Sequence, residues 1–253
     1  MNTEIKSAGR VLDVLEMFST RCDGFTLSEV ARDLDLPKSS TLGLLRTLHQ
    51  RGYLIREDEN DTYRINDLIR RDGFARHGLI LRVVPPVMQA LARSAGETGL
   101  LGMLDTAGQA RLLASELAPS DIRFDIEAPR RLPAYASAIG RILMSRLPTP
   151  DVEAMLDAAP RAALTPATRV ERGAILDAIA AARETGFAIV EDEFCVGGTE
   201  LAAAIAMPEG QPSMALSLAC LSQRYRSDTG RLQALLSAAV TETAEAMARQ
   251  GRP

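Results

Sequence analysis

Residues 26–56 read TLSEVARDLDLPKSSTLGLLRTLHQRGYLIR, and this stretch decides the fold of the first part of the chain. Thr26 stands three residues before Glu29, the spacing of a helix-capping box, so a short helix is predicted to begin there. The segment "DLP" makes a tight corner, and Pro37 opens a second helix that Gly52 closes. Two helices joined by such a short corner form a helix-turn-helix.

The flanking segments extend this unit on both sides. Apolar residues recur at helical spacing before it and predict a first helix from about Ser7 to Ser19. After the second helix, the β-prone runs "YLIR" and "TYRI" flank a polar loop, which predicts a hairpin. A hairpin in this position is a wing. We therefore expect residues 1–72 to form a winged helix-turn-helix domain.

The chain changes character after this domain. Residues 73–95 are predicted to be connecting helices, interrupted at Pro85–Pro86 and resumed from Val87 to Ala95. Residues 96–253 are expected to form a second domain. Its strand-like runs are LLGMLD, ARLLASEL, IRFDI, FAIVED, LAAAIAM and MALSLAC, and its helices are expected near Ala136–Arg146, Pro150–Ala158, Glu171–Thr185 and Asp228–Arg249. Grouped strands and helices favour an α+β fold with a largely antiparallel sheet.

Composition excludes several classes of protein. The 253 residues carry a net charge of −4, which argues against indiscriminate binding of polyanions by the whole molecule. Three scattered cysteines do not suggest a disulfide framework or a zinc site. No signal peptide and no apolar run of about 20 residues is found, so we expect a cytoplasmic protein with no membrane association. We also expect no cofactor.

One face of the second helix is suited to the major groove of DNA. With Leu45 on the core side, a helical period places Ser39, Gly43, Arg46 and Gln50 on the opposite side, with Leu42 at its margin. Small hydroxyls, a guanidinium and an amide are groups that hydrogen-bond to base edges. We therefore predict that this face reads double-stranded DNA.

Local charge agrees with that prediction. Between Leu36 and Arg56 the chain has four basic residues and no acidic one, whereas residues 1–76 hold 12 basic and 13 acidic side chains. The helix N-terminus, with Lys38, Ser39 and Ser40, is expected to take a phosphate, and Arg56 and Arg64 on the wing are expected to follow the neighbouring backbone. Winged helices also serve as protein-interaction modules, and that remains the alternative reading.

The sequence resembles the IclR family of bacterial transcriptional regulators. The matching stretches are KSAGRVLDVLEMF, FTLSEVARDLDLPKSS, LLRTLHQRGYL and YRI in the first domain, then RLPAYASAIGRILMS, GFAIVEDEFCVGGTELAAAI and MALSLAC. The resemblance covers nearly the whole chain. It implies a homodimer or a homotetramer that binds an operator and acts as a repressor or an activator. The second domain is implied to be GAF-like and to sense a small metabolite.

The resemblance also implies an effector pocket. Its positions here are Phe124, Leu132, Ala138, Ile139, Val190, Gly198, Glu200 and Ser217. The N–H groups at Ser137–Ala138–Ile139 begin a helix and are expected to hold a carboxylate. The implied effector is an organic or aromatic acid, or an amine-bearing or zwitterionic catabolite.

Two positions depart from the family pattern. Glu200 stands where many members have a cysteine, and a carboxylate there disfavours an anionic effector unless it is protonated or paired with Arg123 or Arg130. Gly43 stands where the family often has arginine, so this position has no side chain to contact a base. The base preference of this helix is therefore expected to differ from that of family members with arginine at this position.

An enzyme is the rival class. The run "EDE", Glu191 to Glu193, resembles an acidic cluster, but on a strand Glu191 and Glu193 share one face and Asp192 takes the other. No histidine lies nearby, and no phosphate loop, nucleotide fingerprint or nucleophile motif occurs. We therefore predict no catalytic residues, no metal ligands and no enzymatic activity.

Overall fold

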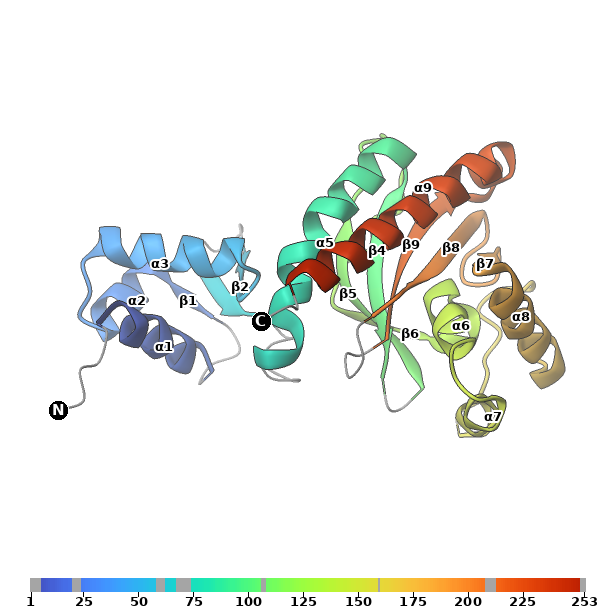
Figure 1. Cartoon of the computed structure of the whole chain (residues 1–253), viewed down its shortest axis with the longest axis horizontal. Coiled ribbons are helices and arrows are strands. Elements are labelled where there is room, and N and C mark those ends of the chain that lie inside the picture. Colours follow the sequence, from blue (N-terminus) through green and yellow to red (C-terminus); the bar gives the residue numbers. More distant parts are fainter. Residues whose placement is uncertain are drawn as a thin grey trace. The chain divides into compact units, whose positions relative to one another are not determined.

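The structure is a computed structural model that describes residues 6–19, 24–57, 62–66, 74–105, 108–158, 160–207 and 213–250, with only the backbone for residues 74–82 and 250. The chain divides into two compact units, residues 1–82 and 83–253. Figure 1 shows the elements of each unit. Cys22 and the side chain of His77 lie outside the described residues.

In residues 6–66, as far as the structure describes them, the first unit packs three helices on a small antiparallel sheet. The helices are α1 (Lys6–Ser19), α2 (Leu27–Asp33) and α3 (Lys38–Gln50), and the strands are β1 (Phe25–Thr26), β2 (Leu54–Glu57) and β3 (Thr62–Ile65) in the order β1-β3-β2. Thr26 and Glu29 form the predicted capping box. Phe18 and Phe25 meet edge to face in the core, with ring centroids 5.2 Å apart. The predicted helix-turn-helix and wing are confirmed.

A single helix, α5 (Phe74–Ala95), follows. The predicted interruption at Pro85–Pro86 is wrong, because the helix continues through both prolines. Each proline removes one backbone hydrogen bond. Both prolines are exposed, whereas Val83, Val84, Val87 and Met88 around them are buried, so packing of the apolar side offsets the loss.

The second unit is built on a six-stranded, fully antiparallel sheet in the order β6-β5-β4-β9-β8-β7. Its strands are β4 (Thr98–Leu104), β5 (Gln109–Glu116), β6 (Arg130–Pro133), β7 (Ala188–Glu191), β8 (Gly198–Ile205) and β9 (Met214–Leu221). The predicted α+β class with an antiparallel sheet is confirmed.

One predicted strand is wrong. Residues 122–126, IRFDI, form no strand. The alternation that suggested one is real, since Phe124 and Ile126 are half-buried while Arg123 and Asp125 are exposed. Its apolar side, however, faces a cavity of the domain and not a neighbouring strand. The alternation of polar and apolar residues therefore indicated correctly that the segment is half-buried, but it did not indicate whether the segment is hydrogen-bonded in a sheet.

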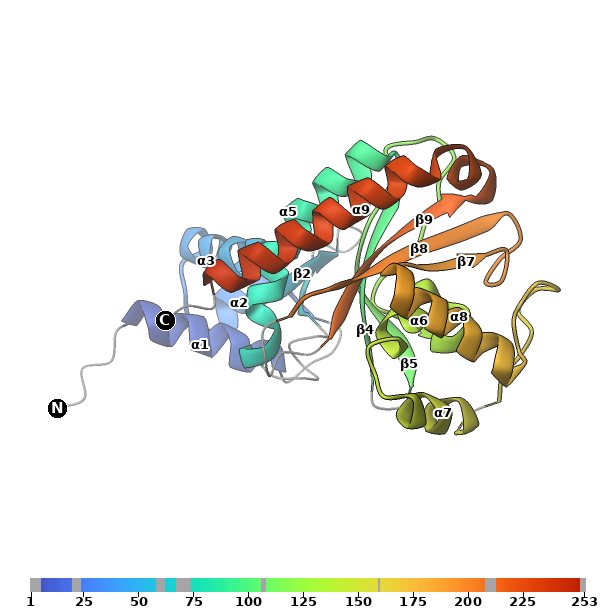
Figure 2. The ribbon, with the colours of Figure 1, turned by 45° about the vertical axis from the view of Figure 1, so that its right-hand side comes forward.

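Helices cover both faces of this sheet (Figures 1 and 2). On one face lie α5 and α9 (Ser222–Gln250), which contact each other where Arg231 donates to the carbonyl of Ser94. On the other face lies α6 (Ala138–Met144), after the 3-10 turn η1 (Ala134–Ala136), with α7 (Thr149–Asp157) and α8 (Arg172–Thr185) outside it. The predicted start of the last helix at Asp228 matches a break, because α9 begins earlier and Asp228 is non-helical within it.

Candidate functional site

The face of α3 opposite its core side is open. Thr41, Leu45 and Leu48 are buried. The residues of the predicted DNA-reading stripe on the other side are all exposed, namely Ser39, Gly43, Arg46 and Gln50. Leu42, at the margin of the stripe, is half-buried. The helical phasing predicted from the sequence is the phasing that the structure has.

The N-terminus of α3 presents free backbone donors. Pro37 is its N-cap residue and supplies no side-chain hydrogen bond. The first backbone bond of the helix runs from the N–H of Thr41 to the carbonyl of Pro37, so the N–H groups from Lys38 to Ser40 precede the ladder. No acidic residue lies in this first turn. Such an end attracts an anion such as a phosphate.

Gly43 is not required by packing. A Cβ atom added to Gly43 would have nothing within 4 Å. The hydroxyl of Thr47, one turn later, donates to the Gly43 carbonyl at 2.8 Å. The empty position therefore lies on the open face and leaves the backbone accessible there.

The two arginines of the wing point to opposite faces of the hairpin. Arg56 pairs in register with Tyr63, and Arg64 pairs with Ile55. Directly opposed residues share a face and successive residues alternate, so Arg56 and Arg64 lie on different sides. Arg64 also donates to the carboxylate of Glu57 at 2.6 Å.

A cavity of about 230 Å³ lies in the second unit, on the side of the sheet that faces α6. Its lining residues are Leu100, Phe124, Asp125, Ile126, Arg130, Leu132, Val190, Phe194, Cys195, Gly198, Thr199, Glu200 and Ala219. Five of the eight positions implied by the resemblance are among them: Phe124, Leu132, Val190, Gly198 and Glu200. The other three, Ala138, Ile139 and Ser217, are fully buried behind the wall.

Glu200 is held in place by two of those buried residues. The N–H of Ala138 donates to its Oε2 at 2.7 Å, and the Oγ of Ser217 donates to its Oε1 at 2.8 Å. The start of α6 was expected to hold a carboxylate, and the carboxylate that it holds is the chain's own. Glu200 is half-buried and keeps accessible surface where it lines the cavity.

The expected arginine partners of Glu200 have other contacts. Arg123 donates to the carbonyl of Ala118 at 3.3 Å, and the guanidinium of Arg130 lies over the ring of Phe194, 5.8 Å from its centroid. Within the described part of the chain, neither arginine hydrogen-bonds to Glu200. The suggested pairing is therefore not present in this structure.

Burial raises the pKa of the Glu200 carboxyl above its ordinary value. Hydrogen bonds from Ala138, Ser217 and Ile139, together with the more distant charge of Arg141, act in the opposite direction but do not cancel the desolvation. The group therefore holds its proton to a higher pH than a carboxyl in water does.

Gly198 shapes the cavity wall. A Cβ atom added to it would lie 2.5 Å from the Sγ of Cys195 and 2.8 Å from the ring of Phe124. Both distances are far below van der Waals contact. Any side chain at this position would have to displace the Phe124 ring and the Cys195 thiol, so glycine lets both approach the start of β8 closely.

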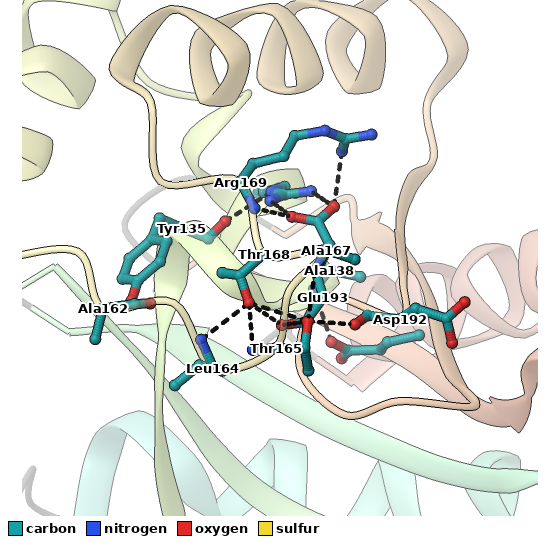
Figure 3. A network of polar contacts seen from close by, with 12 residues as sticks. Tyr135, Ala138, Ala162, Leu164, Thr165, Ala167, Thr168, Arg169, Asp192 and Glu193 are labelled. Carbon is teal, nitrogen blue, oxygen red and sulfur yellow. Dashed lines mark hydrogen bonds and ion pairs between the residues drawn. The ribbon is translucent and has the colours of Figure 1, made fainter.

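A buried ionic network supports the same region (Figure 3). Arg141 of α6 makes a two-pronged bond to Glu193 at 2.7 and 2.5 Å, and Arg169 donates to the same carboxylate at 2.8 Å. The hydroxyls of Thr165 and Thr168 donate to the carbonyls of Asp192 and Glu193, both at 2.6 Å. The network thereby ties α6 to the turn that carries Phe194 and Cys195.

Sequence reasoning missed this network. The run "EDE" was placed on a strand, but β7 ends at Glu191 and Asp192 turns the chain with φ +58°. Glu193 is therefore buried against Arg141. An arginine in the otherwise apolar run AIGRILM was the available signal, because a charge on a buried helix requires a partner.

Two further kinds of site are absent from the described residues. No group of three or more His, Cys, Asp or Glu residues that could hold a metal ion occurs among them. None of the described helices is long and apolar enough to cross a membrane.

Comparison with known proteins identifies both units. Residues 7–58 match the IclR helix-turn-helix domain, and residues 75–249 match the bacterial transcriptional regulator IclR C-terminal domain. The chain belongs to the IclR family. It is a ligand-responsive, DNA-binding transcriptional regulator and not an enzyme.

Individual IclR-family relatives agree over most of their length. The regulator XynR of Escherichia coli is 30% identical over 222 residues, which cover 87% of this chain and 88% of XynR. The structure of a putative regulator from Rhodococcus has a TM-score of 0.65 at 25% identity, covering 98% of this chain and 100% of the other. An IclR homolog from Microbacterium hydrocarbonoxydans, solved with 4-hydroxybenzoate, shares the fold with a TM-score of 0.64 at 22% identity, covering 95% and 98%.

Proposed function

We propose that this regulator binds an operator as a homodimer or a homotetramer through the open face of α3, and that a small metabolite in the cavity of the second unit controls this binding. The exposed face of α3 carries the proposal. It combines unpaired N–H groups at Lys38–Ser40 with Arg46 and Gln50 on one accessible side. Phosphate contacts fix the position of such a helix, and side-chain contacts to base edges select the sequence.

The roles of the individual residues follow from their places. Lys38, Ser39 and Ser40 bind the phosphate at the helix N-terminus. Arg46 and Gln50 reach base edges, while Gly43 lets the backbone approach and leaves Leu42 to contact a thymine methyl group. Because Arg56 and Arg64 lie on opposite faces of the wing, we assign the phosphate contact to the exposed Arg56.

The cavity supports the second half of the proposal. An apolar cavity of about 150 Å³ accepts benzene in another protein. The space here, about 230 Å³, therefore suits a single-ring or similarly compact metabolite. The homolog from Microbacterium hydrocarbonoxydans was solved with 4-hydroxybenzoate, a single-ring molecule, which supports a metabolite of this size.

A titration with DNA tests the proposal. Fluorescence anisotropy measures the affinity for DNA taken from upstream of the regulator's own gene and for a scrambled duplex of equal length, between 50 and 200 mM salt. We expect a preference for the upstream DNA and a steep loss of affinity with salt for both. A winged helix used only for protein assembly would show neither effect, which would contradict the proposal.

A further inference from the structure

We propose that the cavity binds a compact primary amine, whose ammonium group pairs with Glu200 while its apolar body lies against Phe124, Leu132 and Val190. The inference rests on the proposed function, because it names the chemical class of the metabolite for the same cavity. Three observations carry it: the fixed position of the carboxyl, the lack of a cation beside it, and the nature of the walls.

The carboxyl of Glu200 is fixed and still able to accept hydrogen bonds. Its oxygens accept hydrogen bonds from the N–H of Ala138 at 2.7 Å and the hydroxyl of Ser217 at 2.8 Å, and the backbone N–H of Ile139 also acts on the carboxyl. A carboxylate has about four acceptor sites, so an acceptor site remains after these three donors. Because Glu200 lines the cavity, a donor within the cavity can reach that site.

No cationic side chain among the described residues occupies that position. Arg130 is the one positively charged residue among the lining residues that the structure describes, and it is exposed and lies over the ring of Phe194. Arg141, whose charge acts on Glu200 from behind the wall, is bound to Glu193. A buried carboxylate without a cationic partner is unfavourable. A ligand that brings its own positive charge would therefore complete the site.

A carboxylate ligand meets the opposite situation. The donors at the start of α6 that would bind it already hold Glu200. Its charge would lie beside a carboxyl in a poorly solvated space, and like charges disfavour each other there. The exposed Arg130 is the one cation that the described lining offers it, and the same lining also carries the negative charge of Asp125.

The remaining walls suit the rest of an amine. Leu100, Leu132 and Val190 are apolar, and Phe124 and Phe194 add aromatic surface. Aromatic faces attract cations as well as apolar groups. The position of Arg130 over Phe194 shows this attraction at one of the two rings.

Isothermal titration calorimetry on the full chain at pH 7 tests the inference with three matched probes, benzylamine, benzyl alcohol and benzoate. Benzylamine should bind most tightly to the wild type. Glu200→Gln should weaken benzylamine binding about tenfold or more, as loss of a close charge pair does, and should not weaken benzoate binding. Glu184→Gln, which changes an exposed carboxylate on α8, should leave all three affinities unchanged.

The location is checked by Ala219→Leu, which places a larger side chain in the wall beside Glu200 and should weaken benzylamine binding. Tighter binding of benzoate than of benzylamine to the wild type overturns the inference. So does an unchanged benzylamine affinity in Glu200→Gln, or no binding of any probe at millimolar concentration.

The regulatory role is scored separately. The DNA titration is repeated with and without saturating benzylamine. A change in DNA affinity is the expected result. An unchanged DNA affinity would contradict control through the cavity, whereas the calorimetric pattern alone decides the amine inference.

Discussion

Glu200 is a single residue that makes the stability of the folded chain depend on pH. Its pKa is raised in the folded state relative to the ordinary value of 4.5, so the folded chain binds more protons than the unfolded chain above that pH. The contribution of Glu200 to stability is therefore fully present below about pH 4.5 and is lost as the pH rises through the folded-state pKa.

This linkage gives a test by urea unfolding of the full chain at pH 5 and pH 8. The wild type should lose more stability between these two values than Glu200→Gln, which has no carboxyl to ionise. Glu184→Gln serves as the control and should follow the wild type. An identical pH dependence in Glu200→Gln and the wild type would show that the folded-state pKa of Glu200 is not raised.

Glu193 gives a second prediction for a single residue. Arg141 and Glu193 are both almost completely buried, with 1% and 3% of their side-chain surface exposed. Glu193→Gln leaves the Arg141 charge without its counter-ion, which costs about 3–5 kcal/mol of unfolding free energy. Glu191→Gln, which breaks a largely exposed pair with Arg226, should cost about 0–1 kcal/mol. An equal loss of unfolding free energy in both variants, measured by urea unfolding, would show that the buried pair does not stabilise the fold more than the exposed pair.

Sequence reasoning reached the side chains of α3 and stopped short of these two carboxylates. Exposure of Ser39 and Arg46 follows from a local helical period, which the sequence displays directly. The contacts of Glu200 with Ala138 and of Arg141 with Glu193 join residues 62 and 52 positions apart. No local pattern encodes which distant groups meet. The family resemblance therefore placed Glu200 at the pocket, whereas the partners suggested for it, Arg123 and Arg130, are not the ones that it has.

At the scale of elements, α3 carries a glycine that its packing does not need. Alanine in a helix interior is more favourable than glycine by about 1 kcal/mol. Because a Cβ atom at position 43 meets nothing within 4 Å, Gly43→Ala should stabilise the first unit by up to about that amount. Gly173→Ala on α8 has the same open surroundings and is the matched control in the second unit.

Thermal unfolding and DNA titration separate the two roles of Gly43. If the backbone at this position approaches the major groove, Gly43→Ala weakens binding to the upstream DNA while raising stability. Gly173→Ala should not change DNA affinity. Unchanged DNA affinity in Gly43→Ala would mean that the empty position does not face the groove.

Element types were more predictable than element limits. Capping at Thr26 and the hairpin that follows α3 were predictable because their signals are local. The interruption at Pro85–Pro86 was not, because burial of neighbouring valines outweighs two lost hydrogen bonds. The strand predicted at residues 122–126 failed for a similar reason, since a cavity and not a sheet receives its apolar side chains.

At the scale of the whole molecule, two separately packed units divide the work. The first presents an open helix face. The second encloses a cavity whose walls come from the strands β4, β6, β7, β8 and β9, from residues 124–126 and from the turn after β7, and α6 holds Glu200 from behind this wall. A metabolite can change DNA binding only if it has different affinities for two states of the protein. Arg141 of α6 binds Glu193 and so connects α6 firmly to the part of the cavity wall that carries Phe194 and Cys195. A metabolite that contacts this wall could therefore bind differently to two positions of α6.

The central claim is that α3 reads DNA sequence, and Arg46 tests it most directly. The measurement is the ratio of affinities for upstream and scrambled DNA, compared between the wild type, Arg46→Ala and Arg93→Ala, an exposed arginine on α5. We expect Arg46→Ala to lose about 1–3 kcal/mol of this preference while Arg93→Ala keeps it. An unchanged preference in Arg46→Ala, or no preference in the wild type, would show that α3 does not read the DNA sequence through Arg46.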